Sequence, residues 1–129
     1  MPFKELIPAF IEKAEELGGL AKGKVKELLD EYKKAIAFLD TFGFKVSKFN
    51  FSMGLIPEIN TSISGSIENL HEDGLKKMIE EHQAEKLLVS LLNALIMAKR
   101  MQEHIELPLT GVTLDVTLGA PPKITISLH

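Results

Sequence analysis

The chain contains no cysteine, which excludes disulfide bonds, thiol catalysis and cysteine-ligated zinc sites. Small secreted domains often depend on disulfides, so their absence favours the cytoplasm. The first twenty residues also lack the uncharged run of a signal peptide, because six charged side chains interrupt them. We therefore expect a cytoplasmic protein.

Arginine and long hydrophobic runs are scarce as well. Arg100 is the only arginine among fifteen basic residues, and the formal net charge is -3. Nucleic-acid recognition favours guanidinium groups, and a slightly acidic chain has no general attraction to nucleic acid or anionic lipid. The longest nearly uncharged apolar run covers residues 87–98, which is shorter than the about 20 residues that cross a bilayer. We expect no nucleic-acid partner and no membrane span, and we interpret residues 87–98 as a buried helix.

The composition is otherwise that of one globular domain, residues 1–129, with 45% hydrophobic and 26% charged residues. The sequence also resembles itself when it is shifted by 65 positions. Residues 49–54 (FNFSMG) then fall on residues 114–119 (LDVTLG), with the same alternation of apolar and polar side chains. This match predicts two pseudo-repeats, approximately residues 1–65 and 66–129, each with the order helix, helix, strand, strand.

Apolar residues at spacings of three and four predict the helices. In the first half they indicate a helix over residues 7–17, ended by Gly18, and a helix over residues 25–42, ended by Gly43. In the second half a helical pattern runs over residues 69–107. Its apolar stripe shifts at residues 83–86, so the segment is either two helices or one helix with two different neighbours.

Strict alternation predicts two β-hairpins, the first over residues 49–67 with its turn at Pro57 and the second over residues 114–128. Phe44 and Val46 are out of phase with Phe49, which indicates a β-bulge around Ser47 and Lys48. Two hairpins that each bury one face are expected to form a four-stranded antiparallel sheet with helices on one face. The predicted fold is therefore an α+β two-layer domain with an internal ααββ duplication and pseudo-twofold symmetry, in which Phe51 and Val116 both point inward.

The outward positions of the predicted sheet are mainly uncharged and polar, although soluble sheets usually carry more charge. They are Lys48, Asn50, Ser52, Asn60, Ser62, Ser64, Thr113, Asp115, Thr117, Lys123, Thr125 and Ser127. A plain solvent face is one interpretation, and a docking surface or a sheet-to-sheet dimer is the other. Val89 and Ile96 extend the apolar side of residues 87–98 beyond what one sheet covers, so either the N-terminal helix or a second copy should cover them. The predicted interface residues are Val89, Ile96, Asn50, Ser62, Thr117 and Thr125.

These observations favour a non-enzymatic protein that acts through self-association or a protein partner. An alternative is a carrier that holds a hydrophobic small molecule or lipid between helices and sheet, because methionine-rich surfaces adapt to varied ligands. The residues predicted to line such a site are Phe49, Phe51, Met53, Met97 and Leu118.

An enzyme of unknown class is the third hypothesis, but no catalytic residues can be named. No serine lies in a nucleophile-elbow sequence, and no acid pair can be assembled. His82 with Glu81 or Glu85 could hold an ion weakly, or His82 could be the polar end of an apolar stripe; the sequence leaves this open. We expect no metal and no cofactor.

Overall fold

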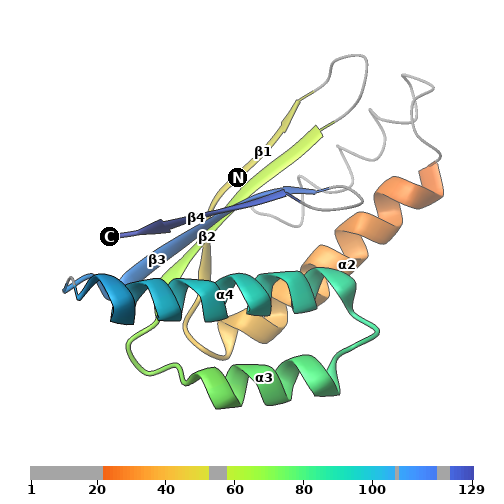
Figure 1. The fold of residues 1–129 in the computed structure, drawn as a ribbon. Helices are drawn as coiled ribbons and strands as arrows, with labels where there is room; N and C mark the ends of the chain where they lie inside the picture. The colour runs from red at the N-terminus through yellow and green to blue at the C-terminus, as the bar shows by residue number, and fades with distance from the viewer. Residues whose placement is uncertain (1–21, 53–57, 107, 119–122) are drawn as a thin grey trace.

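A computed structural model describes residues 22–52, 58–106, 108–118 and 123–129 (Figure 1). The predicted helix over residues 7–17 lies outside this part of the chain. The elements, in chain order, are α2 (Lys22–Asp40), β1 (Lys45–Ser52), β2 (Glu58–Ser66), α3 (Glu72–Glu81), α4 (Lys86–Ile105), β3 (Gly111–Leu118) and β4 (Lys123–Leu128). The α+β class and the antiparallel four-stranded sheet are confirmed, and the helical segment of the second half is broken into two helices near residues 83–86.

The strands lie in the order β1-β2-β3-β4, and every neighbouring pair is antiparallel. Phe49, Thr61, Val116 and Ile124 are partners across the four strands, so their side chains share one face of the sheet. The register of β1 against β2 shifts between Val46 and Lys48, which confirms the predicted bulge.

The strand order contradicts the predicted pseudo-twofold symmetry. The 65-residue shift makes β3 the repeat of β1, and β4 the repeat of β2. A twofold axis at the centre of the sheet would place one strand and its own repeat next to each other there. The central neighbours are instead β2 and β3, which are not matched. In an antiparallel sheet of this order β1 and β3 run in the same direction, so a translation along the sheet would relate the two halves.

The core forms where α2 and α4 meet the apolar row of the sheet. Leu29, Tyr32, Ala35 and Leu39 recur every three or four residues along α2 and are at most 1% exposed. The Tyr32 hydroxyl is hydrogen-bonded to Oγ1 of Thr61, which identifies the face of the sheet that α2 contacts. The helix α4 contacts β3 and β4, and it runs beneath them in Figure 1. Within the described residues, no helix combines the length and hydropathy needed to cross a bilayer.

A third helix, α3, packs against α4 and lies beneath it in Figure 1. Arg100 of α4 donates a hydrogen bond of 2.5 Å from Nε to Oε1 of Glu72 in α3, and this guanidinium lowers the pKa of Glu72 from its ordinary value. Ile96 lies one turn before Arg100 and is only 6% exposed. Ile96 is thus largely buried within the chain itself, and its predicted role in an interface with another molecule stays a prediction.

Candidate functional site

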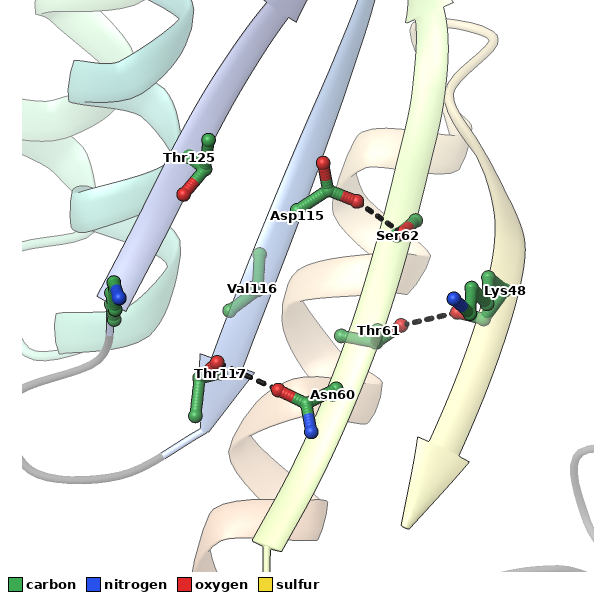
Figure 2. A pocket seen from close by; sticks show the side chains of 9 residues that line it. Lys48, Asn60, Thr61, Ser62, Asp115, Val116, Thr117 and Thr125 are labelled. Atoms are coloured by element: carbon green, nitrogen blue, oxygen red, sulfur yellow. Dashed lines mark hydrogen bonds between the residues drawn. The ribbon is translucent and has the colours of Figure 1, made fainter.

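The polar side chains of β1 to β4 gather on the face of the sheet opposite the Phe49–Thr61 row; we call this surface the polar face. At its centre lies a shallow depression of about 170 Å³ (Figure 2). The residues that line it come from all four strands and are Lys48, Asn60, Thr61, Ser62, Asp115, Val116, Thr117, Lys123 and Thr125. Alternation along each strand places Lys48, Asn60, Ser62, Asp115, Thr117, Lys123 and Thr125 on this face, whereas Thr61 and Val116 lie between these positions and direct their side chains to the opposite face.

Hydrogen bonds between neighbouring strands orient these side chains. Oγ1 of Thr117 donates to Oδ1 of Asn60 at 2.7 Å, and the Ser62 hydroxyl donates to Asp115, as Figure 2 shows. One row further, Oγ of Ser64 lies 2.8 Å from Oγ1 of Thr113. We call these three side-chain pairs between β2 and β3 the polar ladder. It fixes the rotamers of residues that would otherwise move freely in water.

Four of the predicted interface residues lie on the polar face. Ser62, Thr117 and Thr125 line the depression, while Asn50 is exposed and pairs with Asn60 in the neighbouring strand. Ser62 is only 8% exposed because its hydroxyl is turned toward Asp115. Val89 is half-buried on α4 and does not contribute to this surface.

The predicted ligand-binding residues do not line one site. Phe49 and Leu118 pack in the core, where the Phe49 ring centroid lies 5.9 Å from that of Tyr32. Met97 is instead 58% exposed on α4. Phe51 pairs with Ile59 through its backbone, but its side chain lies outside the described part of the structure, as does Met53.

A different apolar hollow, which the sequence did not indicate, lies between α2 and the edge strand β1. It has a volume of about 680 Å³. Its lining residues are Lys33, Ile36, Ala37, Asp40, Phe44, Lys45 and Val46, and Lys45 forms an ion pair with Asp40 at the rim. The available signal was the pair Phe44 and Val46, apolar residues placed before the bulge and out of phase with the rest of β1.

His82 has a local structural environment. Its Nδ1 lies 2.5 Å from Oε2 of Glu85, and its ring packs edge-on against Phe38 at a centroid distance of 4.6 Å. Glu81 is exposed. Across the described ranges, no group of three or more histidine, cysteine or acidic side chains could hold a metal ion. The hydrogen bond and the ring contact account for the position of His82.

Comparison of the chain with protein-family models, with curated proteins and with solved structures finds no match. The candidate site therefore rests on its own geometry. That geometry offers hydroxyl, amide and carboxylate groups held in a fixed pattern on an open sheet face.

Proposed function

We propose that the chain is a non-enzymatic binding protein that docks a protein partner on its polar face. In this proposal the helices form one layer over the apolar side of the sheet and leave the opposite side open to a partner. The internal ααββ duplication predicted from the sequence is retained, with the halves related by translation, and the cytoplasm is the expected location.

The polar ladder is the observation that supports this function. A solvent face needs no fixed hydrogen-bonding pattern, whereas a recognition surface gains affinity when its side chains are ordered before binding. Oδ1 of Asn60 accepts from Thr117, so the two hydrogens on Asn60 Nδ2 are directed to other acceptors. The surface can therefore bind a partner through hydrogen bonds without reordering its side chains.

Charge describes the partner further. Lys48 and Lys123 belong to the outer strands β1 and β4, and Asp115 belongs to the central strand β3. A complementary partner would present a flat polar surface with a donor at its centre and acidic groups on two sides. An apolar partner would bury these polar groups without forming hydrogen bonds to them, which is energetically costly. The polar face would therefore disfavour apolar partner surfaces.

The test is affinity capture from extracts of the native host, with identification of the bound proteins. Thr117→Lys places an additional charge at the centre of the polar face and removes the donor to Asn60. Ala84→Lys adds the same charge at an exposed position after α3, so it serves as the matched control. We expect a partner that the wild type and Ala84→Lys both retain and that Thr117→Lys loses. Capture of the same proteins by all three, or of none by the wild type, would refute the docking role.

The hollow between α2 and β1 supports a second candidate, a carrier of a hydrophobic small molecule. Its volume falls within the range of about 300 to 1,000 Å³ typical of small-molecule sites. Ala37→Trp would fill it, and Ala84→Trp would add the same side chain elsewhere. Native mass spectrometry of protein from its own host should show an added mass in the wild type and in Ala84→Trp, but not in Ala37→Trp. An unliganded wild-type mass would eliminate the carrier.

A further inference from the structure

The edge strand β4 presents backbone groups that no described residue pairs. Gly111 and His129 exchange two hydrogen bonds of 3.0 Å, so they form a hydrogen-bonded pair of the antiparallel ladder. Such pairs alternate with pairs whose backbone groups point away from each other. Ile124, Ile126 and Leu128 occupy the alternate positions, so their N–H and C=O groups point outward from the sheet.

These outward groups form a self-complementary set. They are spaced symmetrically about Ile126, so a second β4 can pair antiparallel with Ile126 opposite its own copy. Ile124 then lies opposite Leu128 of the other copy, and all six outward groups of each strand are hydrogen-bonded. The inward side chains of the same three residues are only half-buried, whereas Val112, Leu114 and Val116 of β3 are at most 2% exposed. The apolar face of the sheet is thus incompletely covered at this edge.

The helix α4 carries an apolar stripe toward the same edge. Residues three apart on a helix are rotated by about 60° in one direction. Nζ of Lys99 donates to the Ile67 carbonyl, just after β2, and Nε2 of Gln102 donates to the Leu109 carbonyl, just before β3. From Lys99 to Gln102 the side-chain direction thus turns from β2 to β3. Three residues further the same rotation directs Ile105 toward β4.

Ile105, Met101 and Met97 follow one another at intervals of four residues, and they are 41%, 50% and 58% exposed. We call them the α4 stripe. They are the large hydrophobic side chains that remain exposed in the described part of the chain. The exposed fraction increases from Ile105 to Met101 to Met97, as expected if these side chains point progressively away from β4 and into the solvent beside the sheet edge.

The two edges of the sheet differ in their protection against pairing. Bulges and charged side chains are the usual means by which edge strands avoid contact with other strands. The strand β1 has both, a bulge between Val46 and Lys48 and a second lysine at Lys45. The strand β4 is regular against β3, and Lys123 at its first position is its only charged residue.

From this geometry we infer that two copies of the chain form a symmetric homodimer through β4 and the α4 stripe. Because α4 contacts both β3 and β4, its axis projects onto the sheet about half a strand spacing, roughly 2.4 Å, inside the edge strand β4. Pairing of the two edges therefore separates the α4 axes by about 10 Å. Helices pack at 8 to 10 Å, so the two stripes meet while the strands pair. The dimer contact uses the edge of the sheet and α4, so it leaves the polar face free. Because the eight strands of the two copies then form one sheet, the two polar faces join into one larger surface.

Single cysteines test the register, because the natural chain has none. Residues opposite each other in a hydrogen-bonded pair have Cα atoms about 5.5 Å apart, within the range that a disulfide spans. Ile126→Cys should therefore form a covalent dimer under mild oxidation. Ile124→Cys is the matched control: its Cα atom would lie about 14 Å from that of its own copy and should not cross-link. Equal cross-linking of the two variants would overturn this interface.

Light scattering on the full chain across a dilution series tests the association itself. We expect a dimer that dissociates on dilution. Met101→Asp changes an exposed residue, so circular dichroism should show an unchanged fold while the dissociation constant rises at least about tenfold. A wild type that is monomeric at every concentration, or a Met101→Asp variant that dimerises as well as the wild type, would overturn the inference.

Discussion

Tyr32 is the only tyrosine of the chain, so its titration can be followed without interference. Its side chain is 0% exposed, and its hydroxyl is hydrogen-bonded to Thr61. Burial raises the pKa of Tyr32 from 10.0 to about 12, although the hydrogen bond to Thr61 lowers it in part. The folded protein therefore holds the tyrosine proton more tightly than the unfolded chain does.

This difference predicts how the free energy of unfolding depends on pH. The contribution of Tyr32 is fully present below pH 10 and is lost as the pH rises through about 12. Two pKa units correspond to about 3 kcal/mol, an order-of-magnitude value. Tyr32→Phe should lose this alkaline dependence, at a cost of about 1 kcal/mol at neutral pH from the missing hydrogen bond.

Ultraviolet absorbance of tyrosinate measures the titration directly. The native protein should give a midpoint near 12, and the urea-unfolded chain should give one near 10. Circular dichroism at each pH shows whether the protein is still folded. A native midpoint near 10 in a protein that remains folded would contradict the burial of Tyr32 beneath the sheet.

Denaturant midpoints check three further predictions about stability. A Cβ added at Gly65 would lie 2.7 Å from Cε1 of the buried Phe44 ring, so Gly65→Ala should destabilise the protein by about 1 to 3 kcal/mol. Gly74 lies in α3 with nothing within 4 Å of an added Cβ, so Gly74→Ala should instead stabilise by up to about 1 kcal/mol. Oε1 of Glu31 accepts a hydrogen bond of 2.6 Å from the Leu87 N–H at the start of α4, so Glu31→Ala should cost about 1 kcal/mol.

The features that could be predicted from the sequence depend on nearby residues. Alternation located both hairpins, and the phase error before Phe49 located the bulge that the register of β1 shows at Ser47. A shift in the apolar stripe likewise indicated the break between α3 and α4. In each case the signal lies within one element or between two consecutive elements, where local backbone geometry controls the outcome.

The features that were missed depend on which elements meet. Ile96 is buried in a helix that packs against both α3 and the sheet, and no pattern within α4 states which neighbours cover each of its sides. Met97 was predicted to line a ligand site between the helices and the sheet, but the rotation that directs Lys99 to the end of β2 leaves Met97 in solvent. The hollow between α2 and β1 is likewise a space between two elements. The sequence pattern shows which side of a helix or strand is apolar. It does not show which other element packs against that side, and these features depend on that packing.

The difference between the two sheet edges determines the kind of assembly that the fold permits. A chain with two open edges would add copies at both ends and grow without limit. Within the described residues the bulge and lysines of β1 oppose pairing on one side and β4 is the edge without such protection, so the inferred isologous β4 contact would leave no further unprotected edge. In the inferred dimer β4 would pair in the plane of the sheet, so the polar faces of the two copies would become continuous. A partner that binds both polar faces would then be held at two linked sites, which raises its apparent affinity without any new kind of contact.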